Sequence, residues 1–241
     1  MIVANKARET VANTKEGVML TIADFQVEPQ NQAALVMYLC RMVKLGELKK
    51  ISKGKYYKPK KSVFGELPLS SNEAVRDLLQ KGRKTIGYIT GTQAFAQMGL
   101  TTQISSSLMV GTNKYRRPIM RGDVRISFLL QPNPIIAKDI PLLRILDAIR
   151  LFKDIPATSP DDCIRQIIRL IEDLPLEQKK KLLNLAKAYA PFVRAIVGAI
   201  FESTGQPELA DSIRRTLNGL TNFRLPISLS VLPNKKTWKI I

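Results

Sequence analysis

Histidine is absent from this chain of 241 residues, and only two cysteines and one tryptophan are present. Without histidine, the commonest general base and the usual imidazole metal ligand are both missing. Cys40 and Cys163 are too few for a zinc site or a disulfide framework, and their helix-like apolar surroundings predict small buried side chains. No GxxxxGK[ST], GxGxxG or GxSxG motif occurs. We therefore expect neither catalysis, nor a cofactor, nor a metal.

Long hydrophobic runs are also lacking. The most apolar stretch, "APFVRAIVGAIF" at 190–201, is too short to cross a membrane and contains Arg194. The first residues, "MIVANKARETVANTKEG", have no signal-peptide core. With 45% hydrophobic residues the composition is that of a globular protein. These features predict a cytoplasmic protein with no membrane partner.

Positive charge is abundant, with 38 Lys and Arg against 20 Asp and Glu, a net charge of +18. Such an excess favours an anionic partner, usually nucleic acid. Residues 1–61 carry twelve basic and five acidic side chains and are the most basic segment per residue. Within them, residues 41–61 hold nine basic side chains and a single acid, Glu47. We expect this part of the chain to meet the polyanion.

The order of elements in residues 1–61 is that of a winged helix-turn-helix. Alternating apolar and basic residues on both sides of Lys53-Gly54 predict a hairpin, which would be the wing. The elements expected are a helix over 3–15, a strand over 18–20, a short helix capped by Thr21, a break at Pro29, a helix over 31–46 capped by Asn31 and ended by Gly46, and the hairpin. The helix over 31–46 would enter the major groove of double-stranded DNA.

The candidate DNA contacts follow from that geometry. Amides near the start of a recognition helix can make paired hydrogen bonds to adenine, and lysines on a wing can meet phosphates. One of the adjacent residues Tyr56 and Tyr57 should face the core, while Asn31 could serve only as a helix cap and a basic hairpin could be merely solvated. The predicted DNA-binding residues are Thr21, Gln30, Asn31, Gln32, Arg41, Lys44, Lys49, Lys50, Lys53, Lys55, Tyr56 and Lys58.

Residues 62–241 form the expected second domain, so that the fold class is α+β. Residues 62–136 predict a mixed α/β section with a helix over 71–82 capped by Ser71 or Asn72 and ended by Gly82. Two strands are expected in this section, "SSLMVGTN" at 106–113 and "DVRISFLL" at 123–130, joined by the basic turn "KYRRPIMRG" at 114–122. Residues 137–241 predict a mainly helical half, which a strand over 224–232 would end. Five helices are expected there, over 140–155, 159–174 with Ser159 as the cap, 175–189, 191–205 and 207–219. Asp123 could suggest a nuclease carboxylate, but no acidic partner with a lysine follows at short spacing, and a turn aspartate is the favoured interpretation.

Three stretches carry a resemblance to a known family. They are "LCRMVKLGELKKISKGKYYKPK" at the helix-to-hairpin junction, "GTQAFAQMGLTTQ" at 91–103 and "YAPFVRAIVGAIFE" at 189–202. In these the chain resembles the AbiEi-like antitoxins of bacterial type IV toxin–antitoxin systems, particularly a DUF6088-like branch. The first stretch is shared by many winged helices, whereas the other two together are more specific.

The resemblance implies a DNA-binding antitoxin. Residues 1–61 would bind operator DNA and repress the protein's own operon, and residues 62–241 would counteract a nucleotidyltransferase-like toxin through the toxin or its target. Two alternatives remain open. One is a stand-alone winged-helix transcriptional regulator with a ligand-binding or dimerisation domain, and the other is an enzyme acting on nucleic acid.

Overall fold

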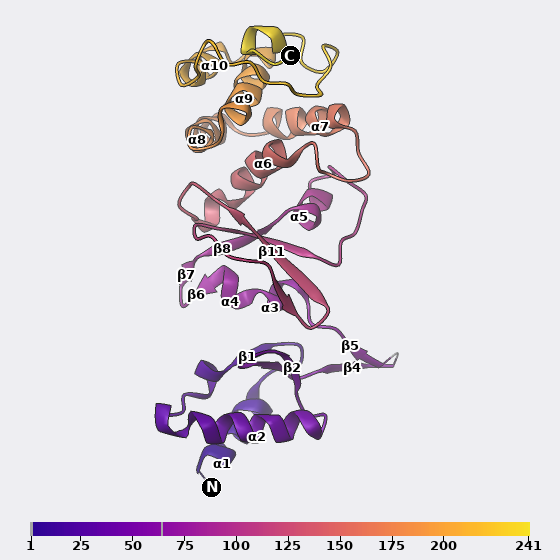
Figure 1. The fold of residues 1–241 in the computed structure, drawn as a ribbon, viewed down its shortest axis with the longest axis vertical. Helices are drawn as coiled ribbons and strands as arrows, with labels where there is room; N and C mark the ends of the chain where they lie inside the picture. Colours follow the sequence, from indigo (N-terminus) through magenta and orange to yellow (C-terminus); the bar gives the residue numbers. More distant parts are fainter. Residues whose placement is uncertain (1, 64) are drawn as a thin grey trace. The chain divides into compact units, whose positions relative to one another are not determined.

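The computed structural model describes residues 2–63 and 65–241, so Met1 and Phe64 lie outside the description (Figure 1). The chain divides into two compact units. Unit 1 comprises Met1–Gln80 and Pro118–Ile126, and unit 2 comprises Lys81–Arg117 and Ser127–Ile241. This division differs from the boundary at residue 61 expected from the sequence. No helix in the described ranges is long and apolar enough to cross a membrane.

Unit 1 begins with the elements that the sequence predicts for residues 1–61, in the predicted order. Their core holds the side chains of Ala7, Val11, Phe25, Leu35, Leu39, Leu48 and Tyr56 among others. The elements are α1 Ile2–Asn13, β1 Met19–Thr21, the 3-10 helices η1 Ile22–Phe25 and η2 Pro29–Asn31, α2 Gln32–Lys44, β2 Lys49–Ser52 and β3 Lys55–Tyr57.

Helix α2 ends as its sequence predicts but begins differently. Gly46, with φ +77°, donates its N–H to the carbonyl of Val43, and Glu47 donates to that of Met42, which is the Schellman pattern. At the other end Asn31 makes no side-chain capping bond. Because η2 already gives Asn31 helical backbone angles (φ −98°, ψ −2°), its side chain is not in the extended geometry that capping needs.

The antiparallel sheet of unit 1 has the strand order β1-β3-β2. In its register Leu20 faces Tyr56 across one strand pair, and Lys50 faces Tyr56 across the other. Gly54, with φ +71°, lies in the turn between β2 and β3, where a left-handed backbone is required. We call residues 49–57 the basic hairpin.

The remaining elements of unit 1 lie beyond residue 61. They are β4 Lys60–Ser62, β5 Gly65–Leu67, α3 Ser71–Ala74, α4 Arg76–Leu79, β10 Ile119–Arg121 and the first residues of β11 Val124–Leu130. The single helix predicted over 71–82 is wrong: it is broken at Val75, its cap is Ser70, and Gly82 lies in a turn. The Ser70 hydroxyl accepts the N–H of Glu73, which fixes the start one residue earlier.

Two ties hold these later elements onto the first sixty residues. Glu73 accepts the N–H of Met19 (3.0 Å), and Arg76 donates to the carbonyl of the same residue. The turn between β10 and β11 donates the N–H of Gly122 to the carbonyl of Ile51 in the basic hairpin (3.1 Å). Asp123, in that turn, is exposed, as expected for a turn aspartate. Contacts distant in sequence therefore move the boundary of unit 1.

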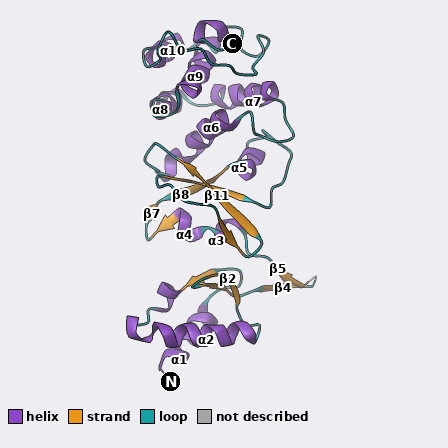
Figure 2. Ribbon diagram, viewed as in Figure 1, coloured by secondary structure: helices purple, strands orange, loops and turns teal. Residues whose placement is uncertain are grey.

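Unit 2 contains a β-sheet covered by helices (Figure 2). Its strands are β8 Gly87–Thr90, β9 Leu108–Thr112 and β11, with β9 between the other two, and α5 Thr92–Gln97 follows β8. A small hairpin of β6 Gln80–Lys81 and β7 Lys84–Thr85 precedes them. The strands predicted around 108–112 and 124–130 are confirmed.

Five helices follow the sheet in unit 2 and are those predicted. They are α6 Ile140–Leu151, α7 Pro160–Glu172, α8 Leu176–Ala186, α9 Pro191–Ser203 and α10 Pro207–Arg214. Helix α6 packs against β8, α5, α7, α8 and α9 (Figure 1). The cap of α7 is the predicted Ser159, whose hydroxyl accepts the N–H of Asp162. Cys163 is fully buried as expected, and burial raises its thiol pKa to about 12.

The core of unit 2 encloses a carboxylate, Asp147 on α6, which is fully buried. It accepts hydrogen bonds from Tyr88 (2.6 Å), Thr90 (2.9 Å) and Tyr189 (2.9 Å), and the amide of Gln131 donates to both tyrosine hydroxyls (2.7 and 2.6 Å). Burial raises the pKa of Asp147, and the hydrogen bonds from the three hydroxyls oppose the rise. No local sequence pattern indicates this network, because its members are scattered over residues 88–189.

The strand predicted over 224–232 is wrong. This segment is irregular, with turns at its end, and its apolar side chains, Leu225, Ile227, Val231 and Leu232, enter the helical core. The 3-10 helix η4 Lys235–Trp238 then brings Trp238 against α9. A Cβ added at Gly198 would lie 2.1 Å from the indole ring, so this close approach requires glycine.

Candidate nucleic-acid interface

The amides predicted to read bases lie at the start of α2, and the structure distinguishes among them. Gln32 is exposed and makes no side-chain hydrogen bond among the described residues, whereas Gln30 donates to the carboxylate of Glu28 (2.7 Å). Asn31 is half-buried and, as noted above, does not cap the helix with its side chain. Gln32 is therefore the amide best placed to meet an external hydrogen-bonding partner.

The solvent-facing side of α2 combines small apolar side chains with two cations. Leu35, Leu39 and Met42 face the core. The opposite side exposes Ala33, Ala34, Val36, Met37, Arg41 and Lys44. No acidic residue occurs between Pro29 and Gly46. This face carries no charge that would repel a phosphate backbone, and its methyl groups are of the kind that contact thymine.

Two of the predicted lysines are held by acidic residues within unit 1. Lys49 forms an ion pair with Glu66 of β5, which raises the pKa of Lys49 through a hydrogen bond and the opposite charge. Lys55 lies 2.8 Å from Asp77 of α4. Both side chains are therefore turned toward the protein itself.

The other predicted lysines in and just after the basic hairpin have a different environment. Lys50 and Lys53 are exposed, and Lys58, one residue beyond the hairpin, is half-buried. None of the three has an ion pair among those found in the described part of the chain. Lys50 and Lys53 are therefore the hairpin cations most available to a polyanion.

Two of the predicted DNA contacts have other roles in the structure. Tyr56 is only 1% exposed, and burial raises the pKa of its hydroxyl, so it belongs to the core and is not available to DNA. Tyr57 is the half-exposed member of the pair. Thr21 begins η1, where its hydroxyl donates to Asp24 (2.8 Å) and its N–H donates to the same carboxylate oxygen (2.7 Å).

The sequence of this chain matches the model of a known protein family. The profile of the family of unknown function DUF6088 matches residues 6–177, which is more than half of the chain. The chain belongs to the DUF6088 family. That part of the expected resemblance is confirmed, while the antitoxin identity stays a prediction.

A distant solved structure has a similar fold. A crystal structure of the RV2827C protein from Mycobacterium tuberculosis matches with a TM-score of 0.51 at 14% identity. The match covers 92% of this chain and 84% of that one. At this identity the likeness concerns the fold alone. No curated protein matches this chain.

The sequence did not indicate the contacts of Asp77 with Arg121 and Lys55, which hold the basic hairpin and which we call the clamp. Asp77 accepts two hydrogen bonds from Arg121 of β10 (2.5 and 2.9 Å) in addition to its contact with Lys55, and Arg121 also donates to the carbonyl of Ala74 (2.6 Å). Burial alone would raise the pKa of Asp77, but the hydrogen bonds from Arg121 and Lys55 outweigh it and lower that pKa. The signal was not available locally, because Asp77 and Arg121 are 44 residues apart.

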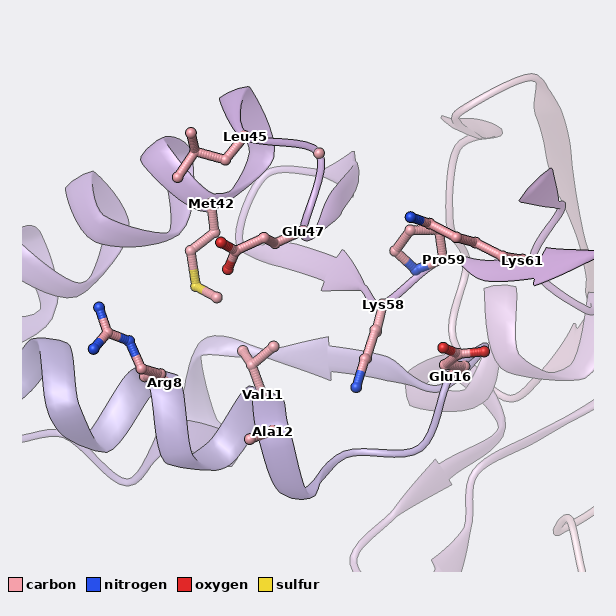
Figure 3. A pocket seen from close by; sticks show the side chains of 11 residues that line it. Arg8, Val11, Ala12, Glu16, Met42, Leu45, Glu47, Lys58, Pro59 and Lys61 are labelled. Atoms are coloured by element: carbon pink, nitrogen blue, oxygen red, sulfur yellow. The ribbon is translucent and has the colours of Figure 1, made fainter. Parts of the chain in front are cut away.

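A pocket of about 440 Å³ lies on unit 1 beside the C-terminal end of α2 (Figure 3). Met42 comes from α2, Leu45 caps the end of that helix, and Arg8, Val11 and Ala12 come from α1. The charged residues around it are Arg8, Glu16, Glu47, Lys58 and Lys61. With both signs present, it is less suited to a phosphate chain than the exposed face of α2 and the edge of the basic hairpin.

Proposed function

We propose that this protein is a DNA-binding antitoxin of a type IV toxin–antitoxin system that represses its own operon. In this proposal unit 1 is a winged helix-turn-helix, α2 is the recognition helix and the basic hairpin is the wing. The observation that carries it is an acid-free, exposed α2 face followed directly by a hairpin whose Lys50 and Lys53 are not ion-paired in the described structure. Such an arrangement supplies side chains for base edges and cations for phosphates.

The antitoxin role rests on the resemblance described above and on the size of unit 2. Unit 2 contains β8, β9, most of β11 and the five helices α6 to α10, more than a dimerisation tail needs. We propose that it acts by binding, either to a nucleotidyltransferase-like toxin or to the target of that toxin.

DNA binding is tested with the full chain and the DNA directly upstream of its gene. Fluorescence anisotropy should give tighter binding to this DNA than to an unrelated duplex of the same length, with affinity falling as salt rises. Equal affinity for both duplexes would contradict operator recognition.

The antitoxin role is tested separately, by growth after co-expression with the nucleotidyltransferase-like toxin that this proposal expects to be encoded beside the gene. The full chain should restore growth, and a variant with Gln32→Ala, Lys50→Ala and Lys53→Ala should restore it as well if unit 2 acts alone. Specific DNA binding without rescue would favour the stand-alone regulator over the antitoxin.

A further inference from the structure

Unit 2 contains a strongly basic cleft of about 550 Å³ that the function proposed above does not use. Its cationic side chains are Lys81, Lys84, Lys114 and Arg116, and no acidic residue lines it. The whole segment Lys81–Arg117 carries six basic residues and no Asp or Glu. None of the four cations takes part in an ion pair found within the described ranges. Unneutralised cations around a concave surface favour an anionic ligand.

The cleft also has an apolar side. Ile86, Pro134, Ile135 and Ile136 line it together with the cations, and Ile136 is 45% exposed. A small ligand with one flat apolar part and one anionic part would use both surfaces. The volume falls within the range of about 300–1,000 Å³ that is typical of small-molecule sites.

One wall of the cleft is anchored to the core. The amide of Asn113 donates to the carbonyls of Gln131 (2.8 Å) and Asn133 (2.6 Å). Asn133 in turn donates to the carbonyl of Leu185 on α8 (3.0 Å), inside the core. Lys114 therefore follows a residue that is held in place, which lowers the entropic cost of ordering the cleft around a bound ligand.

We propose that this cleft binds a nucleotide, with its phosphates on Lys81, Lys84, Lys114 and Arg116 and its base against Ile86 and Ile136. The nucleotide could be free or could be the unpaired end of a nucleic-acid strand, since both present the same base and phosphates. A blunt duplex presents a convex ridge of phosphates and no accessible base face, and it fits this concave, partly apolar surface less well.

The experiment measures fluorescence of N-methylanthraniloyl-ATP on adding the full-length protein. Lys81→Gln with Lys84→Gln should raise the Kd about tenfold or more, since charge-assisted hydrogen bonds to phosphate are among the strong ones. The matched control is Lys180→Gln with Lys187→Gln, which removes two exposed charges on or just after α8 and should change the Kd by less than about twofold. Circular dichroism verifies that each variant is folded.

A second variant keeps every cation and changes only the apolar side. Ile136→Ser should weaken ATP more than inorganic triphosphate, because it removes a contact to the base. If the lysine variant does not fold, Lys114→Gln with Arg116→Gln provides the same charge test on the opposite segment of the cleft.

Competition distinguishes the two sources of the nucleotide. Displacement of the labelled ATP by unlabelled ATP alone indicates a free nucleotide, and displacement also by an oligonucleotide with an unpaired 3′ end indicates a strand end. The proposal is overturned if labelled ATP does not bind, if the cleft variants bind it as tightly as the control, or if those variants lose affinity only for blunt duplex DNA.

Discussion

At the scale of single residues, the basic hairpin separates its lysines into two groups. Lys49 and Lys55 are engaged by Glu66 and Asp77, whereas Lys50 and Lys53 are exposed and not ion-paired within the described structure. A composition count cannot make this distinction, since all four lysines belong to one short segment. The exposed pair should therefore account for the salt dependence of DNA binding.

We expect Lys50→Ala with Lys53→Ala to flatten the plot of log affinity against log salt by about 2, because each phosphate contact contributes about −0.9 to the slope. The loss should be the same for operator and unrelated DNA. The measurement is anisotropy at four or more salt concentrations, with Lys180→Ala and Lys187→Ala as the control of equal charge. An unchanged slope would place the DNA surface away from this hairpin.

The amides at the start of α2 give a second prediction at this scale. Gln32→Ala should reduce discrimination at one or two base pairs by about 1–3 kcal/mol while leaving affinity for unrelated DNA nearly intact. Gln30→Ala is the matched comparison, because the Gln30 amide is already bonded to Glu28. Binding-site selection with both variants checks this. A motif relaxed by Gln30→Ala but unchanged by Gln32→Ala would reverse the assignment.

At the scale of elements, periodic sequence patterns predicted helices and strands correctly, whereas elements that depend on contacts distant in sequence were predicted wrongly. Helix α2, the basic hairpin and the five C-terminal helices follow from apolar spacing, caps and glycine positions, which are local signals. The segment 224–232 shows the limit, because apolar residues there pack against helices and no sheet edge receives them. The start of α2 shows a second limit, because Asn31 belongs to a 3-10 helix and therefore lacks the extended backbone that a capping asparagine needs.

For the candidate site, the sequence indicated some of the exposed residues but not the contacts that hold the basic hairpin in place. Exposed Lys50 and Gln32 were found from charge and position, and Tyr56 was assigned wrongly because neighbouring tyrosines give no sign of which one faces the core. The clamp of Asp77 and Arg121 depends on β10, a strand that the sequence suggested only as a basic turn. No local pattern pairs two such residues across more than forty positions.

That clamp gives a prediction for the hairpin as an element. Arg121 has only 2% of its side chain exposed, and replacing it with methionine would leave Asp77 half-buried with Lys55 alone. We expect Arg121→Met to destabilise unit 1 by about 2–4 kcal/mol, less than for a fully buried pair because Asp77 remains 26% exposed. Urea unfolding followed by circular dichroism measures this. Adding Asp77→Asn should recover part of the loss, and simple additivity of the two changes would show that the pair is not coupled.

At the scale of the whole molecule, the two units contain carboxylates with opposite pKa shifts. In unit 1 the pKa of Asp77 is lowered, so its contribution to stability is present above the ordinary carboxyl pKa and is lost as pH falls toward the folded value. In unit 2 the pKa of Asp147 is raised, so its contribution is present below the ordinary pKa of about 4 and is lost as pH rises through the folded value. Unit 2 also contains Glu202 and Asp161, whose pKa values are lowered by hydrogen bonds, so acid weakens both units and the Asp147 contribution is the one of opposite sign among these carboxylates.

The single tryptophan makes the contribution of Asp147 measurable. Trp238 is buried in unit 2, so its fluorescence reports that unit. Urea titrations between pH 4 and pH 9, followed by this fluorescence, are compared for the unaltered protein and for Asp147→Asn. Above pH 4 the fluorescence-detected stability of the unaltered protein should decline relative to Asp147→Asn, because the amide cannot acquire the buried charge. The pH limit keeps Tyr88 and Tyr189 neutral, since burial raises the pKa of both. A constant difference between the two proteins would mean that Asp147 keeps one protonation state across this range.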